Sequence, residues 1–237
     1  MFIFKYADKN ILLLMYMIYF SDVGVFFLIR YLDFINVMAY DMHGYWESKT
    51  GENSPMYVGS SDTSDYEKTQ NVDYIIKYYI KKGAAPGKLL LGMGTYGNSF
   101  TLKSSSNNGV GAPIKGPGKA GPYSGEEGEL AYNEICEQHN AGKWQYHWNS
   151  EQQCIYAVNG DQWVGFDDIK AIKIKTEYIK SKGLGGAMIW SIDMDDFRNK
   201  CGDGKQSHKI IYEHELLVNI FSNHSRLPAT GSKFMRF

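Results

Sequence analysis

A tyrosine and an aspartate stand next to each other at the end of an apolar run near the start of the chain. The run Phe34-Ile-Asn-Val-Met-Ala precedes Tyr40 and Asp41, and a polar segment begins after Gly44. Buried parallel strands are near-continuous apolar runs, so the pattern predicts a strand over 32–41 that brings a phenol and a carboxylate to the carboxyl edge of a sheet. In an α/β barrel, catalytic groups stand at that edge. The alternative is that the Asp41 carboxylate only caps the strand end.

Two further apolar runs predict strands that would lie beside the first. They cover 88–96 and 184–193, and the second delivers Trp190 and a cluster of aspartates. Apolar residues spaced three to four apart predict helices over 71–82 and 169–182, each followed by glycine. A strand, a helix and a strand in this order form a right-handed parallel unit, so the fold class is α/β.

Residues 98–165 interrupt this rhythm. They are rich in Gly, Ser, Asn and Pro and then in aromatic residues, with a helical pattern at 126–139. Because a loop of this length is uncommon inside a compact domain, we interpret the segment as a small α+β insertion.

Composition excludes several function classes. The chain has 237 residues with 25 basic and 26 acidic side chains, and no basic stripe that would suit nucleic acid. Cys136, Cys154 and Cys201 lack metal-ligand spacing, so we expect neither a metal nor another cofactor. Aromatic residues make up 15% of the chain, and exposed aromatic rings beside polar loops are typical of a carbohydrate groove.

The first 29 residues are strongly apolar in two segments, 11–20 and 23–29. No small-x-small cleavage site follows the first segment, so it does not predict a signal peptide. A membrane span over 11–29 would bury Asp22 at a cost of roughly 2.5–3.5 kcal/mol. We therefore expect no membrane partner, although residues 11–29 are apolar.

With the three strands in place, the chain resembles glycoside hydrolase family 18, the chitinases and chitinase-like lectins. The resemblance covers about residues 30–205 and depends on ordered motifs. These motifs are Met38-Ala-Tyr-Asp-x-His-Gly-x-Trp-Glu47, Asn71-Val-Asp-Tyr74, Gly83-Ala-Ala-Pro86, Tyr96-Gly-x-Ser-Phe-Thr-Leu102, Tyr132-x-Glu-Ile-Cys136, Trp163-Val-Gly-Phe-Asp-Asp168 and Gly185-Gly-Ala-Met-Ile-Trp-Ser-Ile-Asp-x-Asp-Asp-Phe197.

The resemblance implies a partial (β/α)8 TIM barrel in which the three predicted strands are strands six to eight, with an α+β chitinase insertion domain. The domains expected from it are a non-homologous apolar leader at 1–29, barrel strands six and seven with their connecting helix at 30–97, the chitinase insertion domain at 98–165, the last barrel helix and strand eight at 166–205, and a divergent tail at 206–237.

The resemblance also implies a site for β-1,4-linked N-acetylglucosamine polymers, chitin or chitooligosaccharides. In family members the acetamido carbonyl of the sugar attacks its own anomeric carbon, while a glutamic acid protonates the leaving oxygen. Tyr40 would bind the acetamido oxygen and Asp41 a sugar hydroxyl. Trp190 would form the floor of the subsite, with Met38 and Met188 packed beside it. Ordinary core packing is the alternative for the two methionines.

Four more residues are implied as substrate-binding. Trp46 would stack on a sugar on the leaving-group side, and Tyr96 and Glu134 would reach the sugar from the insertion domain. Asn98 stands where many members carry arginine, which removes one charged contact.

The resemblance further implies a disulfide between Cys136 and Cys201, which are 65 residues apart, and an extracellular location. Cys154 is then left over as a free or mispaired thiol.

The proton donor of the family ends a motif, Asp-Gly-x-Asp-x-Asp-Trp-Glu, that has no match here. Asp62-Thr-Ser-Asp-Tyr-Glu67 imitates it, but no apolar run leads into it, and we interpret it as a solvated loop. The prediction is a truncated chitinase-family chain that is inactive alone. The alternatives are a non-catalytic chitin-binding, lectin-like protein and a fragment without a stable function.

Overall fold

Three parallel strands form a small sheet in the computed structural model, which describes residues 2–5, 12–15 and 31–201. They are β3 (Ile35–Val37), β4 (Leu89–Gly94) and β11 (Gly186–Trp190), in the order β11-β4-β3. All three lie inside the predicted strands and are shorter at both ends. In the register, Ile35 is opposite Leu89 and Gly186 is opposite Leu90. The carboxyl ends of β3 and β11 therefore flank that of β4.

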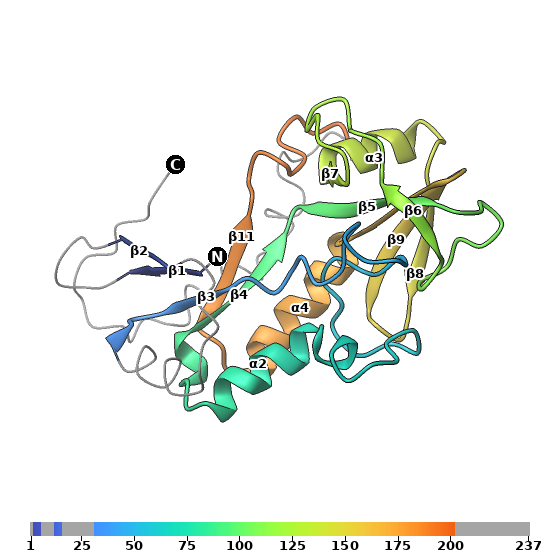
Figure 1. Ribbon diagram of the computed structural model, residues 1–237. Helices are drawn as coiled ribbons and strands as arrows, with labels where there is room; N and C mark the ends of the chain where they lie inside the picture. The colour runs from blue at the N-terminus through green and yellow to red at the C-terminus, as the bar shows by residue number, and fades with distance from the viewer. Residues whose placement is uncertain (1, 6–11, 16–30, 202–237) are drawn as a thin grey trace.

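Two helices connect these strands, as predicted. They are α2 (Val72–Lys81) and α4 (Ile169–Lys182), and they lie beside each other next to the sheet (Figure 1). The side chain of Asn71 accepts a hydrogen bond from the backbone N–H of Tyr74 and caps α2, and Asp168 caps α4 in the same way. Gly183 ends α4 with a φ of 62°, in the left-handed region that glycine adopts without strain.

Residues 96–166 form a second, antiparallel sheet of six strands. They are β5 (Tyr96–Leu102), β6 (Ile114–Pro117), β7 (Glu129–Ala131), β8 (Gln145–Asn149), β9 (Cys154–Asn159) and β10 (Gln162–Phe166). The strand order is β6-β5-β10-β9-β8, and β7 pairs with β5. Only Thr95 separates β4 from β5, so one extended stretch of chain passes from the first sheet into the second (Figure 1).

The helix of this region is shorter than the sequence pattern predicts. It is α3 (Tyr132–Asn140), whereas the expected helical segment was 126–139. Residues Glu129–Ala131 instead pair with Tyr96–Asn98 as β7, and Gly128 has a φ of 87° that interrupts a helix. Two short 3-10 helices lie earlier in the chain, η1 (Glu67–Thr69) before α2 and η2 (Pro86–Lys88) between α2 and β4.

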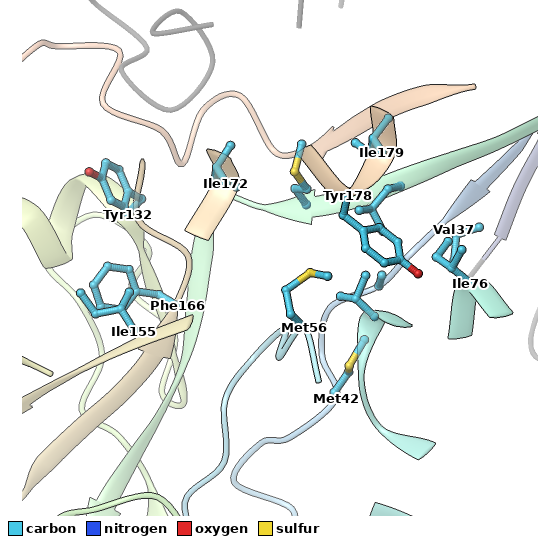
Figure 2. Close-up of a cluster of buried hydrophobic side chains, with 14 of the residues drawn as sticks. Val37, Met42, Met56, Ile76, Tyr132, Ile155, Phe166, Ile172, Tyr178 and Ile179 are labelled. Atoms are coloured by element: carbon cyan, nitrogen blue, oxygen red, sulfur yellow. The ribbon is translucent and has the colours of Figure 1, made fainter. Parts of the chain in front are cut away.

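The two sheets share one apolar core. Figure 2 shows Val37 and Ile76 on the side of the parallel sheet and Ile155 and Phe166 on the side of the antiparallel sheet, all within one cluster. Met56, from the loop after β3, is fully buried between them. Burying a side chain of this size contributes about 1.5–3 kcal/mol, so the shared core fixes the two sheets against each other.

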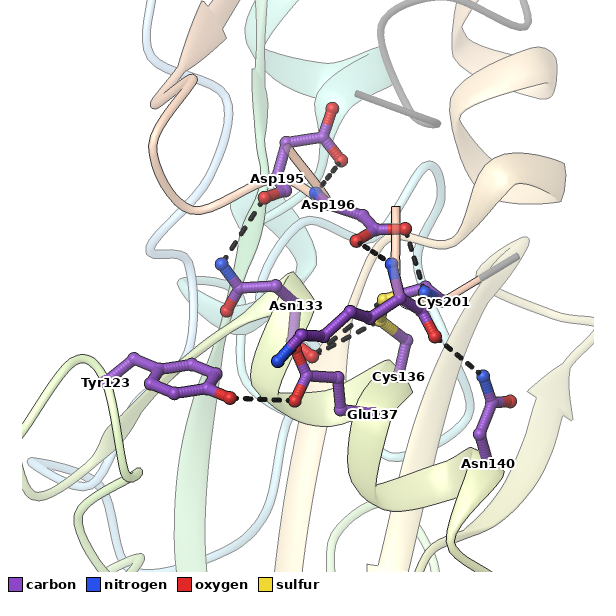
Figure 3. Close-up of a disulfide and its surroundings, with 9 residues drawn as sticks. Tyr123, Asn133, Cys136, Glu137, Asn140, Asp195, Asp196 and Cys201 are labelled. Carbon is purple, nitrogen blue, oxygen red and sulfur yellow. Dashed lines mark hydrogen bonds and ion pairs between the residues drawn. A yellow bond between two sulfur atoms is a disulfide. The ribbon is translucent and has the colours of Figure 1, made fainter. Parts of the chain in front are cut away.

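A disulfide joins Cys136 of α3 to Cys201, with 5.3 Å between their Cα atoms, and confirms the predicted pairing (Figure 3). The Asp196 carboxylate accepts hydrogen bonds from the backbone N–H groups of Lys200 and Cys201 at 2.8 and 2.9 Å. The segment after β11 is thereby tied to α3. Cys154 is buried and free.

Near the start of the chain, β1 (Phe2–Lys5) and β2 (Leu12–Met15) pair antiparallel. The rest of the expected leader at 1–29, most of the apolar stretch 11–29 and the expected tail at 206–237 lie outside the described residues. Among the residues that are described, no helix has the length and apolar character needed to cross a membrane.

Candidate functional site

A cavity of about 400 Å³ lies at the carboxyl ends of β3 and β11. We call it the Trp190 cavity, and it is lined by Asn36, Met38, Tyr40, Asp41, Met188, Ile189 and Trp190. Asn36, Met38 and Tyr40 alternate along the chain, as expected when every second side chain points to one face of a strand. The structure thus brings together five residues that the sequence singled out from two distant segments.

Tyr40 forms a buried wall of this cavity. Its side chain is 7% exposed, its hydroxyl points to the Met188 sulfur at 4.0 Å, and its ring meets Tyr96 edge to face with 5.9 Å between centroids. Burial, and secondly the charge of Asp41, raises the pKa of Tyr40 above its ordinary value. The phenol therefore keeps its proton near neutral pH and can donate a hydrogen bond into the cavity.

Asp41 is held in an unusual backbone conformation at the cavity edge. Its φ is 58°, in the left-handed region that few residues other than glycine adopt. Three hydrogen bonds offset this strain. The Asp41 N–H donates to Oδ1 of Asn53 at 2.9 Å, and the Asp41 carboxylate accepts from the Tyr96 hydroxyl at 2.6 Å and from Nδ2 of Asn98 at 3.2 Å. The carboxylate is fixed in place while its residue stays exposed.

The buried amide side chains of Asn53 and Asn98 hold Asp41 in place. Nδ2 of Asn98 also faces the His43 carbonyl at 2.8 Å and Oδ1 of Asn53 at 3.1 Å, and Nδ2 of Asn53 donates to the Tyr96 carbonyl at 3.1 Å. Asn98 is 5% exposed and lies outside the lining of the Trp190 cavity, so the structure places it under Asp41. The sequence analysis did not single out Asn53, which occurs in a polar loop without a recognisable pattern.

Glu134 is buried and lies outside the lining of the Trp190 cavity. The residue is 1% exposed, and its carboxylate accepts hydrogen bonds from the backbone N–H groups of Tyr123, Ser124 and Ala131 and from the Ser124 hydroxyl. All of these partners belong to the protein. Glu134 therefore fastens the 121–131 segment to the first turn of α3.

Trp46 also lies outside the Trp190 cavity. It is 59% exposed, it meets Tyr45 edge to face, and its ring covers Gly44 so closely that any side chain there would clash. The ring is open to solvent, but the described contacts do not place it beside Tyr40 or Trp190.

Glu67, the imitation of the family's acid, lies in a largely exposed loop, as predicted, and is held there by an ordered network. Its carboxylate pairs with the Lys49 ammonium at 2.6 Å and accepts backbone N–H bonds from Thr63 and Ser64 at 2.9 and 2.8 Å. The Lys49 contact, followed by the Ser64 bond, holds the pKa of Glu67 well below its usual range. A carboxylate that is ionised in this way cannot act as a general acid near neutral pH.

A second cavity, of about 370 Å³, lies between β7 and the loop after β11. We call it the acidic cavity, and its lining consists of Tyr123, Ser124, Glu126, Glu129, Ala131, Asn133, Asp193, Met194, Phe197 and Arg198. Burial, and then the like charges of Glu126 and Asp41, raises the pKa of Glu129. The charge of Asp41 in the Trp190 cavity therefore acts on Glu129 in the acidic cavity. Glu126 and Glu129 were missed from sequence because both fell in the first turn of the predicted helical segment at 126–139.

The described residues contain no group of three or more His, Cys, Asp or Glu side chains that could hold a metal ion.

The family model for glycosyl hydrolases family 18 matches residues 21–195. The chain belongs to this family. Chitotriosidase-1 of Mus musculus is 49% identical over 175 residues, which are 73% of this chain and 36% of that protein. Chitinase-3-like protein 2 of Homo sapiens is 48% identical over 176 residues, which are 73% of this chain and 44% of that protein. The chain thus spans less than half the length of these relatives.

Solved structures agree with this assignment. The Group IV chitinase of Ostrinia furnacalis superposes with a TM-score of 0.77 and 34% identity over 84% of this chain and 53% of the chitinase. Human YKL-39, described as a pseudo-chitinase with retained chitooligosaccharide binding properties, superposes with a TM-score of 0.75 and 42% identity over 84% of this chain and 53% of its own.

Proposed function

We propose that this polypeptide binds chitooligosaccharides, with one N-acetylglucosamine unit in the Trp190 cavity. The observation that carries the proposal is the fixed Asp41 carboxylate, which lies beside a protonated phenol and an exposed indole at one sheet edge. A flat apolar sugar face suits the ring of Trp190, which is 44% exposed. Tyr40 donates to the acetamido oxygen, and Asp41 accepts from a sugar hydroxyl.

The barrel assignment supports this placement and is part of the proposal. We take β3, β4 and β11 as strands six to eight of a (β/α)8 barrel and residues 98–165 as the insertion domain. The parallel register of the three strands and the superposition on family 18 chitinases support both assignments. Barrel enzymes build their sites at the carboxyl ends of the strands, where the Trp190 cavity lies.

We propose that these 237 residues bind without hydrolysing. Substrate-assisted hydrolysis is an exception to the usual scheme of two carboxylates, but it still needs an acid that protonates the leaving oxygen. The sequence contains no Asp-Gly-x-Asp-x-Asp-Trp-Glu motif, and Glu67 is ion-paired with Lys49. The carboxylate of Asp41 is fixed as an acceptor by Tyr96 and Asn98. The human pseudo-chitinase supports this combination of binding without catalysis.

The disulfide supports an extracellular location, because such bonds persist in oxidising compartments.

Trp fluorescence during titration with chitotetraose tests the binding. We expect a change in emission on binding, and an affinity at least about tenfold lower in Trp190→Ala because a stacked ring is lost. Trp148→Phe is the matched control, since Trp148 lies in β8 and outside the Trp190 cavity. Equal affinities of Trp190→Ala and the wild type would contradict the proposal.

Release of a fluorophore from a chitobioside tests the absence of catalysis. We expect no turnover above the buffer rate by the purified chain. Turnover that Asp41→Asn abolishes would show that the cavity is catalytic after all, and would favour a chitinase over a binding protein.

A further inference from the structure

The acidic cavity adjoins the Trp190 cavity through the backbone. The N–H of Thr95 donates to the Trp190 carbonyl, and the Thr95 carbonyl accepts from the N–H of Tyr132 at the start of α3. The N–H of Asn133 donates to the Met194 carbonyl at 3.2 Å. In Figure 1 the loop after β11 accordingly reaches β7 and α3. Glu129, which lines the acidic cavity, is also close enough to Asp41 of the Trp190 cavity for the Asp41 charge to act on it.

Negative charge dominates this cavity. Its lining includes the carboxylates of Glu126, Glu129 and Asp193, against the single guanidinium of Arg198. Arg198 lies over the rings of Tyr123 and Phe197, at 5.4 and 5.2 Å from their centroids, so its charge faces aromatic groups.

Glu129 is the carboxylate on which several other negative charges act. It is half-buried, and the charged groups that face it are the carboxylates of Glu126, Asp41 and Glu134. Like charges at a partly buried carboxyl favour a cation in the space between them.

A buried acceptor in the same wall is an independent sign of a ligand. Asn133 is 6% exposed, and its Nδ2 donates to the Asp195 carbonyl at 3.3 Å, but its Oδ1 has no hydrogen-bond partner. In Figure 3 this oxygen points to the side on which Tyr123 lies, and both residues line the acidic cavity. Buried acceptors are rarely left unpaired in proteins, so a donor is missing here.

The remaining walls suit a sugar ring. Tyr123 and Phe197 are 48% and 40% exposed, and the Tyr123 hydroxyl donates to Glu137 at 2.8 Å, which holds its ring in place. The carboxylates and the Asn133 amide oxygen are hydrogen-bond acceptors, so they suit a cation that carries several N–H and O–H donors.

We propose that the acidic cavity binds an unacetylated glucosamine unit through its ammonium group, next to an N-acetylglucosamine unit in the Trp190 cavity. The ligand class is therefore partially deacetylated chitin. An ammonium has three donors and no acceptor, which matches carboxylates and the free amide oxygen of Asn133. The inference rests on the proposed function, because it assumes that the neighbouring unit occupies the Trp190 cavity.

NMR titration with di-N-acetylchitobiose and its two mono-deacetylated isomers tests the inference at mildly acidic pH. We expect one isomer, but not the other, to bind about tenfold tighter than the fully acetylated disaccharide, with a preference that weakens in high salt. Equal affinities of all three disaccharides would overturn the inference and leave the proposed function standing. Failure of all three to shift the Trp190 indole signal would overturn the proposed function as well.

Two variants test which side chains cause the preference for the mono-deacetylated disaccharide. Glu129→Gln removes the central charge and is expected to abolish the tenfold preference while binding of the fully acetylated disaccharide changes less than about threefold. Glu126→Gln tests the same point at an exposed residue whose replacement does not threaten folding. Glu127→Gln is the control, because it changes net charge equally and lies outside the cavity lining. A preference that both cavity variants retain would overturn the inference.

Discussion

The phenol of Tyr96 donates a 2.6 Å hydrogen bond to the Asp41 carboxylate across 55 residues of sequence. Tyr96 is the first residue of β5, in the antiparallel sheet, whereas Asp41 follows β3 of the parallel sheet. The bond therefore joins the two sheets at the cavity. Burial, and secondly the charge of Asp41, raises the pKa of Tyr96 well above its usual value, so the phenol remains a donor at neutral pH.

Tyr96→Phe removes this donor and leaves the ring. We expect chitotetraose affinity to fall about 5- to 20-fold, since the Asp41 carboxylate loses a charge-assisted hydrogen bond that orients it. Calorimetric titration measures the change. Tyr146→Phe is the control because the Tyr146 hydroxyl is buried without a hydrogen-bond partner. If both variants bind like the wild type, the Tyr96 bond does not contribute to the site.

Glu134→Gln tests whether Glu134 is structural. The amide replaces a carboxylate that accepts four hydrogen bonds from Tyr123, Ser124 and Ala131, so the free energy of unfolding should fall by roughly 1–3 kcal/mol. Urea unfolding measures this loss. Affinity for chitotetraose should stay within about threefold of the wild type. An unchanged stability together with lost affinity would restore Glu134 to the substrate site.

The pH dependence of stability depends on Glu52, which is fully buried beside β8 and β10 of the antiparallel sheet. Its Oε1 accepts from Nδ2 of Asn149 at 3.3 Å, and its Oε2 has no partner. Burial raises the pKa of Glu52 from 4.5 to about 8, although bonds from Asn149 and Cys154 oppose the shift. Both states hold the proton below pH 4.5, but only the folded state holds it between 4.5 and 8. The stabilising contribution of the protonated Glu52 to the free energy of unfolding is therefore fully present below pH 4.5. It is lost as the pH rises from 4.5 to about 8.

Glu52→Gln should remove this loss. From pH 4.5 to about pH 8, the free energy of unfolding of the variant minus that of the wild type should rise by roughly 2–4 kcal/mol. Chemical unfolding at several pH values measures it, and Glu127→Gln, at an exposed position, should show no such rise. Parallel curves for the wild type and Glu52→Gln would rule out a buried proton.

The disulfide closes a loop of 65 residues between Cys136 and Cys201. Replacing both cysteines by serine should lower the free energy of unfolding by about 4 kcal/mol, as the chain-entropy estimate gives for a loop of this length. Thermal unfolding with and without reductant measures the effect. Cys154→Ala is the control, and its melting temperature should not respond to reductant differently from that of the wild type. A double variant as stable as the wild type would contradict the estimate.

Local patterns in the sequence were enough to predict the parallel strands and their helices. Continuous apolar runs indicated β3, β4 and β11, and the spacing of apolar residues together with Gly83 and Gly183 indicated the two helices and their ends. The pairing of Tyr40 and Asp41 with Trp190 followed from the rule that parallel strands end at one edge. These features depend on the few residues around each position.

The rest of the site depends on contacts between distant residues. Asn53 and Asn98 are polar residues in ordinary surroundings, and only the fold makes them the support of Asp41. Glu129 follows a helical pattern in the sequence, but its backbone pairs with β5 and its side chain lines the acidic cavity. For Glu134 a local signal did exist, since a glutamate three residues into a helix often accepts a backbone N–H at the helix start.

The single residue between β4 and β5 has a consequence for how a ligand would bind. One unbroken stretch of chain crosses both sheets, and the two sheets share one core. The two sheets therefore cannot hinge away from each other. A sugar chain bound as proposed would meet walls whose shape is already set, and little conformational entropy would be lost on binding. Affinity in such a groove is determined by which units of the sugar chain fit, and not by the closing of the protein around them.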